Sequence, residues 1–275
     1  MDWRLHYPGA PDDGVNLLTR ILTRLIPARV RKYDLRLVVA AILYRVSNGC
    51  KWRALDRACL PWHVAYDYYR RWTRSGALDR ANALIVRLER RRRNRADAHE
   101  SHSEPAVIVV DAQSVKSRVE GRREALGYDG FKRVKGVARH VACDLRGNVL
   151  ACVCAPANDH ESTWLKDVLI AVRHAGFARA HVVVADGGYE GQDFLAAVEG
   201  FELEVVKRSD VDGGKASGKP NTFKPLARRW VIERTFGYLM FSRVLTCCYE
   251  RLTECSEANV LWAGIRAILR RWEKL

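Results

Sequence analysis

The segment Ala106-Val107-Ile108-Val109-Val110-Asp111 marks the point where the periodicity of the sequence changes. Its apolar residues run together without helical spacing, which predicts a short buried strand that ends at Asp111. A second apolar run, residues 181–185, ends in the same way at Asp186. Acids at the carboxyl ends of central strands stand where open α/β sheets bind their ligands. This half of the chain is therefore predicted to form an α/β sheet with two aspartates at one edge.

Further strands and helices are expected on both sides of these two runs. The additional expected strands cover 136–145, 148–155 and 201–207. The expected helices cover 164–174, 192–198, 226–241 and 257–272. Ser162 or Thr163 is the expected cap of the helix at 164–174, and residues 212–220, rich in Gly and Lys, are expected to form a loop. This order predicts a mixed sheet layered by helices.

The first 95 residues carry helical periodicity instead. The expected helices cover 33–46, 52–58, 61–75 and 78–93, whereas residues 1–30 are weakly patterned. Gly49 follows the first of these helices as a stop signal, and Pro61 stands where a helix accepts a proline in its first turn. Short helices joined by tight turns are typical of a helix-turn-helix-like module.

The helix at 61–75 has two interpretations. An aromatic stripe lies on one face of it, and Arg70, Arg71 and Arg74 crowd its C-terminal half. As a recognition helix, it would place these arginines on DNA phosphates or guanine edges. As an ordinary amphipathic helix, it would bury the aromatic residues and leave the arginines in solvent.

A run of arginines follows the last of these helices and leads into a polar stretch. Its members that we expect to contact phosphate are Arg90, Arg91, Arg92 and Arg93. The expected domain division is a helical part at 1–95, a linker at 96–105 and a catalytic part at 106–275, which is expected to keep its fold alone.

Composition limits the class of protein. The chain has 275 residues, a formal net charge of +15 and 48% hydrophobic residues, which excludes a disordered chain and is compatible with an acidic partner such as nucleic acid. No apolar stretch is long enough for a transmembrane helix, and residues 1–6 contain no apolar signal region. We therefore expect a cytoplasmic protein with no membrane partner. The eight cysteines form no Cys-x-x-Cys pair, which argues against zinc.

A third acid, Glu233, lies in the helix expected at 226–241. Taken singly, the two aspartates could be turn residues, and Glu233 could form a structural ion pair with Arg229 or Arg234. Taken together on a basic chain, the three acids favour a two-metal site for phosphoryl transfer, because close carboxylates repel unless a hard cation such as Mg²⁺ lies between them.

Several blocks of sequence, in order, carry a more specific signal. In the second half they are 110–117 (VDAQSVKS), 127–136 (GYDGFKRVKG), 139–144 (RHVACD), 156–160 (PANDH), 185–189 (ADGGY) and 228–236 (RRWVIERTF). In the first half they are 41–44 (AILY), 49–53 (GCKWR) and 61–62 (PW). Together these blocks resemble the bacterial insertion-sequence DDE transposases of the "insertion sequence five" family.

The resemblance implies an RNase H-like catalytic fold with an N-terminal all-α DNA-binding domain. It implies that Asp111, Asp186 and Glu233 are catalytic and hold Mg²⁺, with Mn²⁺ as a substitute. The family signature has the pattern Tyr-x-x-Arg-x-x-x-Glu-x-x-x-x-x-x-Lys. Arg229 matches its Arg, but Leu226 and Met240 stand at its Tyr and Lys positions. Arg243, one turn beyond Met240, is the substitute expected for the basic residue.

The resemblance also implies a function. The expected protein is a transposase that binds the terminal inverted repeats of its own element and catalyses Mg²⁺-dependent strand cleavage and strand transfer. Its expected partners are double-stranded DNA and a second copy of itself, assembled on DNA at the bacterial nucleoid. Two alternatives stay open: a metal-dependent nuclease that does not join ends, and an inactive or domesticated DNA-binding protein.

Other polar residues near the expected sheet have weaker assignments. Lys132, Arg133, Lys135 and Arg139 form a basic cluster expected to contact the DNA backbone. Lys116 could contact phosphate if its strand continues beyond Asp111, or it could be a solvated lysine. His160 could approach the metals or cap the next helix, and His140 is expected to be structural.

Overall fold

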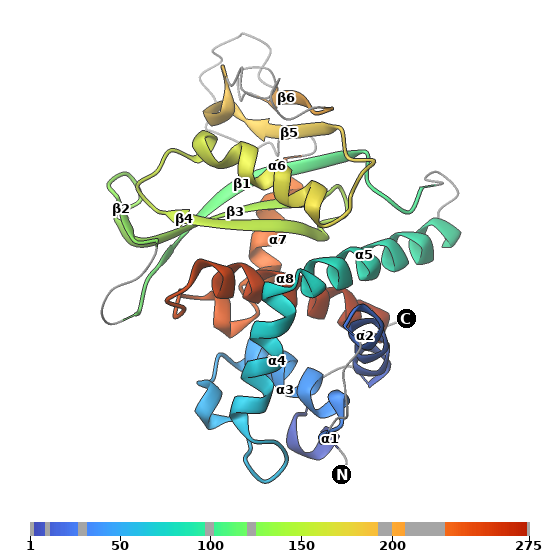
Figure 1. The fold of residues 1–275 in the computed structure, drawn as a ribbon. Helices are drawn as coiled ribbons and strands as arrows, with labels where there is room; N and C mark the ends of the chain where they lie inside the picture. Colours follow the sequence, from blue (N-terminus) through green and yellow to red (C-terminus); the bar gives the residue numbers. More distant parts are fainter. Residues whose placement is uncertain are drawn as a thin grey trace, which may run out of the picture.

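The computed structural model describes residues 3–8, 12–26, 32–96, 102–119, 125–191, 200–206 and 229–273. A mixed sheet from the second half of the chain lies above a group of helices that come mainly from the first half (Figure 1). The helix expected at 192–198, the loop at 212–220 and the start of the helix at 226–241, with Leu226, lie outside the described residues. No described helix combines the length and apolarity needed to cross a membrane.

Six strands form the sheet within the described ranges. They are β1 (Val107–Lys116), β2 (Gly127–Asp129), β3 (Val134–Asp144), β4 (Val149–Pro156), β5 (Val182–Asp186) and β6 (Glu202–Val206). The order is β2-β3-β1-β5-β6, with β4 also paired to β3. β1, β5 and β6 run parallel, whereas β3 is antiparallel to β1, β2 and β4. The predicted mixed α/β sheet is thus present.

Strand β1 is longer than its apolar run predicts. It pairs with β3 from Ile108 opposite Asp144 to Lys116 opposite Gly136, so Asp111 lies within the strand, opposite Val141, and not at its end. The apolar run ends earlier because β5 covers only the first part of β1, and residues 111–114 are half-buried and tolerate polar side chains. Asp186 does end its strand, as predicted.

Helices cover both faces of the sheet. Helix α6 (Leu165–His174) packs on β3 and β4 on one face, where His140 meets Trp164. It begins after a 3₁₀ helix, η2 (Glu161–Trp164), that is capped by His160, so neither Ser162 nor Thr163 is the cap. Helix α7 (Trp230–Leu239) packs on the other face, where Thr235 contacts Cys143. Since side chains alternate along a strand, Asp111, opposite Val141, faces α7.

The N-terminal helices are α1 (Trp3–His6), α2 (Asp12–Leu25), α3 (Leu35–Asn48), α4 (Trp62–Arg74) and α5 (Ala77–Ala96), with a 3₁₀ turn η1 (Trp52–Ala54). Helix α3 ends as predicted at Gly49, which adopts the left-handed conformation with φ of 66°. Helix α2 was not expected, although Val15, Leu18 and Leu22 bury one face of it at helical spacing. Helix α5 continues through the arginine run to Ala96, because arginine is a good helix former.

The last helix, α8 (Thr253–Trp272), packs against both halves of the chain. It contacts β4 of the sheet and also α3, α4 and α5. The rings of Trp72 and Trp262 lie 6.0 Å apart, and the Tyr69 hydroxyl donates to the Cys255 carbonyl at 2.6 Å. The hydrophobic core is therefore continuous from α2 to β5. The expected division of the chain at 96–105 stays a prediction. Helix α8, from the expected catalytic part, packs against the helices of the expected N-terminal part as well as against the sheet.

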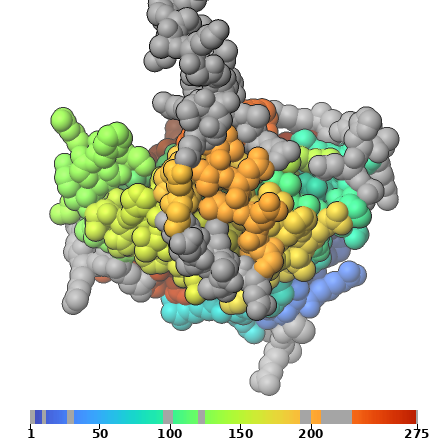
Figure 2. All heavy atoms as spheres, turned by 90° about the horizontal axis from the view of Figure 1, so that it is seen from above, coloured from blue at the N-terminus to red at the C-terminus, as the bar shows by residue number. Residues whose placement is uncertain are grey.

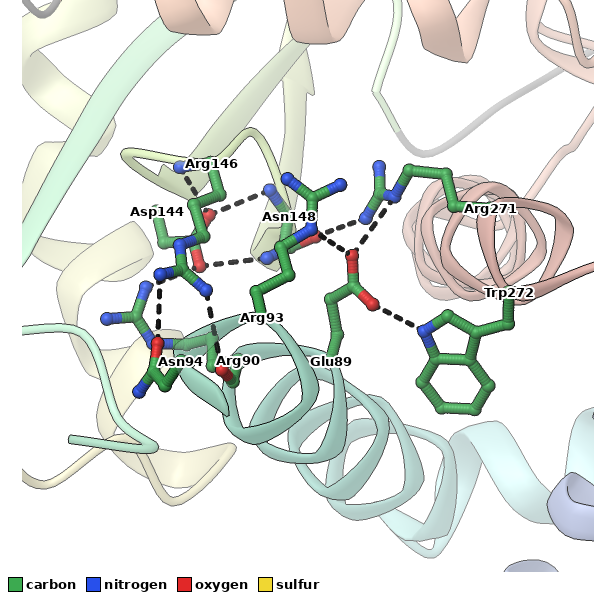
Figure 3. Close-up of polar contacts among 9 residues, drawn as sticks. All are labelled: Glu89, Arg90, Arg93, Asn94, Asp144, Arg146, Asn148, Arg271 and Trp272. Carbon is green, nitrogen blue, oxygen red and sulfur yellow. Dashed lines mark hydrogen bonds and ion pairs between the residues drawn. The ribbon is translucent and has the colours of Figure 1, made fainter. Parts of the chain in front are cut away.

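A buried polar network joins α5, α8 and the turn between β3 and β4 (Figure 3). Asp144, fully buried, pairs with Arg90 of α5 at 3.0 Å and accepts from Asn148. Glu89, also buried, accepts from Arg93, from Arg271 and from the indole of Trp272. These charges are compensated within the fold, so the network fixes α5 and α8 to the sheet.

Candidate active site

The three predicted acids meet around one guanidinium group. The Nη2 atom of Arg229 lies 3.2 Å from Oδ2 of Asp186, and 3.8 Å from both Oδ2 of Asp111 and Oε1 of Glu233. Because one nitrogen atom reaches all three, no two of these oxygens can be farther apart than about twice 3.8 Å. Asp111 comes from the central strand β1, Asp186 from the end of its parallel neighbour β5, and Glu233 from helix α7.

Local backbone geometry orients the two aspartates. Oδ1 of Asp186 accepts from the backbone N–H of Gly188 at 3.0 Å, which closes the short turn η3 (Gly187–Tyr189) after β5. Oδ1 of Asp111 accepts from the N–H of Ala112 at 2.7 Å. In each aspartate the other oxygen, Oδ2, faces Arg229. The backbone thus fixes one oxygen and leaves the other directed into the site.

Burial changes the acidity of Asp111. Its side chain is 13% exposed, and desolvation raises the pKa of its carboxyl from 3.8 to about 6. The negative charges of Asp186 and Glu161 raise this pKa further, whereas Arg229 and the Ala112 hydrogen bond lower it. A buried acid among other acids gains from a cation more than an exposed one does, because the cation offsets both the burial and the repulsion.

The donor set fits a hard divalent cation. Carboxylate oxygens are the ligands that Mg²⁺ prefers, and a positive group already lies between them in the form of Arg229. With that guanidinium in place, no three His, Cys, Asp or Glu side chains in the described part of the chain are arranged to hold a metal directly. The hydroxyl of Tyr189, fully buried beside the acids, has no hydrogen-bond partner among the described residues. Such an orphaned group fits a site that a hydrated ion completes.

A fourth acid, Glu161, lies at this site without having been predicted. It opens η2, and its charge contributes to the raised pKa values of both Asp111 and Tyr189. The sequence offered one signal, since Glu161 directly follows the block at 156–160 that carries part of the resemblance. Nothing in that block indicates that η2 folds toward the end of β5.

His160 and Lys116, two further candidates, have other surroundings than the three predicted acids. His160 accepts from the N–H of Ser162 and its Nδ1 lies 2.7 Å from the Ser162 hydroxyl, which fits the capping interpretation. Lys116 ends β1 and is exposed, on the face opposite to Asp111 because five residues separate them. It lies roughly 16 Å along the strand from Asp111. His140 is buried at 1% exposure beside Trp164, and desolvation lowers its pKa to about 4, so it is a neutral packing residue.

Several predicted DNA-contacting arginines are engaged inside the fold. Arg90 is 4% exposed and pairs with Asp144, and Arg139 is 3% exposed and donates to the carbonyls of Leu245 and Cys247. Burial of both guanidinium groups gives them a structural role, and we leave them out of the DNA surface proposed below. Arg70, largely buried, pairs with Glu254 of α8, and Arg74 contacts the same carboxylate but remains exposed at the surface.

Other predicted cations remain on the surface. Arg71, Arg91, Arg92 and Arg243 are exposed, and Arg93 is partly exposed and paired with Glu89. Lys132, Arg133 and Lys135 are exposed on the hairpin between β2 and β3, where Arg133 adopts a positive φ of 52°. This hairpin projects from one side of the molecule, to the left in green (Figure 2).

A pocket of about 440 Å³ lies between this hairpin and the segment that carries Glu161. Ala112 and Ser114 of β1 form part of its wall, and Glu161 lines it as well. On the hairpin side it is lined by Lys132 and by Phe131, whose side chain is 97% exposed. Basic and aromatic side chains beside an acidic centre form a surface suited to a nucleic-acid strand.

The protein has a mixed sheet flanked by helices. Acids from a central strand, from the end of its neighbour and from a late helix lie around the guanidinium of Arg229. These features define an RNase H-like domain of the DDE type. Residues 102–268 match the transposase DDE domain family, and the chain belongs to this family. Residues 15–82 match a second family, described as putative transposase of the IS4/5 family.

One curated relative is a putative transposase for insertion sequence element IS402 from Burkholderia cepacia. It is 29% identical to this chain over 123 residues, which make up 42% of the chain and 54% of the relative. The match thus spans about half the length of that relative. The family match at 102–268 contains Asp111, Asp186 and Glu233, and that at 15–82 contains helix α4.

Proposed function

We propose that this protein is a transposase that binds the terminal inverted repeats of its own mobile element, cuts the DNA there and joins the freed ends to a target. The observation that carries the proposal is that Asp111, Asp186 and Glu233 lie around the guanidinium group of Arg229 on an RNase H-like sheet. This arrangement supports phosphoryl transfer, and the family match supports DNA as the substrate.

In this proposal Asp111, Asp186 and Glu233 hold Mg²⁺, for which Mn²⁺ substitutes. Bound Mg²⁺ supplies activation of the attacking oxygen and charge stabilisation of the leaving oxygen. Asp111 contributes as its carboxylate, which predominates above its pKa of about 6. Arg229 pairs with the acids when no metal is present and becomes available to a DNA phosphate when the acids bind the ion.

The proposed DNA surface begins at the β2–β3 hairpin. Lys132, Arg133 and Lys135 would contact phosphates next to the pocket that leads to Glu161. Arg71, Arg91, Arg92 and Arg243 extend the exposed positive charge over the helical part of the chain. We also propose that two copies assemble on two DNA ends at the nucleoid.

The experiment is incubation of the protein with Mg²⁺ and a DNA end from the element that flanks its gene. We expect cleavage at the end sequence, followed by joining to a second DNA. Cleavage without joining would instead identify a metal-dependent nuclease. Binding without cleavage would identify an inactive or domesticated protein, and the replacement of the signature Lys by Met240 is the sequence feature that favours this outcome.

A further inference from the structure

Glu161 and Asp186 converge on the same glycine. Glu161 begins η2, whose first turn is fixed by the His160 cap. A Cβ atom placed on Gly188 would overlap Oε1 of Glu161 and lie 3.1 Å from Oδ1 of Asp186. The two carboxylates therefore approach each other across the bare backbone of Gly188. Only glycine at this position leaves room for such an approach.

Arg229 contacts Asp186 at 3.2 Å, but no described residue contacts the carboxylate of Glu161 directly. The carboxylate of Glu161 makes no hydrogen bond and no ion pair within the described ranges, although the side chain is half-buried. Burial and the charge of Asp186 raise the pKa of Glu161, while Lys132, His160 and Arg229 lower it only from a distance. Two facing carboxylates without a shared cation repel each other, so their proximity calls for a positive ligand.

Tyr189 provides a second, independent observation. Its ring is fully buried, and its hydroxyl finds no hydrogen-bond partner among the described residues. Burial raises the pKa of the phenol, and the negative charges of Glu161, Asp111 and Asp186 raise it further. A buried hydroxyl is rarely left unpaired unless water or a ligand completes its surroundings. Tyr189 directly follows Gly188 in η3, the turn that Asp186 caps, so the unpaired hydroxyl belongs to the same short segment as the two facing carboxylates.

We propose that Glu161 is a fourth carboxylate of the divalent-cation site, acting with Asp111, Asp186 and Glu233. The inference rests on the proposed function, since it assigns an additional ligand to the same site. A carboxylate supplied by η2 would hold the ion from the side of the sheet opposite to α7. In the structure the acids face one guanidinium, that of Arg229. Divalent ions would bring more positive charge than this group does, and the carboxylate of Glu161 would help to balance it.

Metal binding without DNA tests this assignment directly. The full-length protein is titrated with Mn²⁺, and free Mn²⁺ is measured by electron paramagnetic resonance. Glu161→Gln should weaken binding by about tenfold or more, as loss of a carboxylate near a metal does, and Glu161→Asp should weaken it less. Glu202→Gln, on the exposed face of β6, is the matched control and should bind as the unaltered protein does. Equal affinities of Glu161→Gln and Glu202→Gln would overturn the proposal.

Two further measurements separate the possible failures. If Asp111→Asn also binds Mn²⁺ with unaltered affinity, the cation site itself is refuted and the proposed function falls with it. If only Glu161→Gln is unaltered, Glu161 is not a ligand and the three-acid site stands. Thermal unfolding in EDTA should give Glu161→Gln a Tm equal to or above that of Glu202→Gln, because an uncompensated charge is removed. A clearly lower Tm would make Glu161 a structural residue and overturn the assignment.

Discussion

At the scale of single residues, the site holds carboxylates that repel one another, and a bound cation would reduce this repulsion. Asp111 is buried beside Asp186 and Glu161, and its pKa of about 6 reflects that cost. Arg229 reduces the cost by pairing with the acids at one point. Carboxyl groups with strongly shifted pKa values occur mainly at functional sites. The raised pKa of Asp111 therefore favours a functional role for this residue over a stabilising one.

This reasoning predicts a pH-dependent gain in stability from removing the charge of Asp111. The folded-state pKa lies above the ordinary 3.8, so the folded state binds the proton more tightly and stability falls as pH rises from about 4 to about 6. In EDTA, Asp111→Asn should therefore be more stable than the unaltered protein by up to about 3 kcal/mol near pH 8. Urea unfolding at pH 4, 6 and 8 measures the difference. A difference that stays constant across this range, or that reverses in sign, would contradict the assigned burial.

Local signals in the sequence explain which residues of the site could be predicted. Asp186 follows an apolar run and precedes two glycines, and Glu233 lies in a helical pattern, so each has a local context. Glu161 was not predicted because its role depends on how η2 packs against Gly188. The burial of Arg90 and Arg139 could not be predicted for the same reason, since their partners come from distant strands and loops.

At the scale of secondary structure, local and non-local signals differ in the same way. Helix α3 ends at Gly49 in the left-handed conformation, as the sequence predicts, and Gly147 adopts the same conformation in the turn before β4. The full length of β1 depends on its pairing with β3, which periodicity does not report. The β2–β3 hairpin covers the block at 127–136, but the sequence does not show that the hairpin projects from the sheet (Figure 2).

The exposed hairpin predicts an electrostatic contribution to DNA binding. Replacement of Lys132, Arg133 and Lys135 by Gln should weaken binding to end DNA and to unrelated DNA alike, because phosphate contacts carry no sequence information. The slope of log affinity against log salt should fall by about two to three, at roughly 0.9 for each phosphate that is no longer neutralised. Fluorescence anisotropy over a salt series measures both effects.

The matched control replaces Arg20, Arg24 and Lys32, which are exposed in the N-terminal part and change the net charge equally. This control should bind DNA much as the unaltered protein does. If the two triple variants lose affinity and salt dependence to the same extent, net charge and not the hairpin determines binding.

At the scale of the whole molecule, the helical and catalytic parts are packed as one body. Helix α8 lies between the sheet and helices α3, α4 and α5, and Asn82 of α5 donates to the carbonyl of Val149 on β4. The network around Asp144 adds buried charges whose partners come from both halves (Figure 3). This packing differs from the expectation that the catalytic part keeps its fold alone, because periodicity does not show that the last helix is shared.

A fragment of residues 106–275 should therefore be far less stable than the full chain. It lacks α5, which supplies the ion-pair partner Arg90 of Asp144, and Trp262 no longer packs against Trp72. A fragment that begins at Ala77 keeps α5 and should recover part of this stability. Circular dichroism and urea unfolding compare the two. A cooperative transition of 106–275 at the denaturant concentration of the full chain would show that the halves fold independently.

The central claim is that Asp111, Asp186 and Glu233 form the catalytic cation site of a DNA-processing enzyme. Its most direct test is Mg²⁺-dependent cleavage of the element's end DNA by Asp111→Asn, beside Asp167→Asn on the exposed face of α6 as the matched control. We expect Asp111→Asn to bind the DNA normally and to lose cleavage by at least about a thousandfold, while Asp167→Asn cleaves normally. Cleavage by Asp111→Asn at the rate of the control would contradict the assignment of the site.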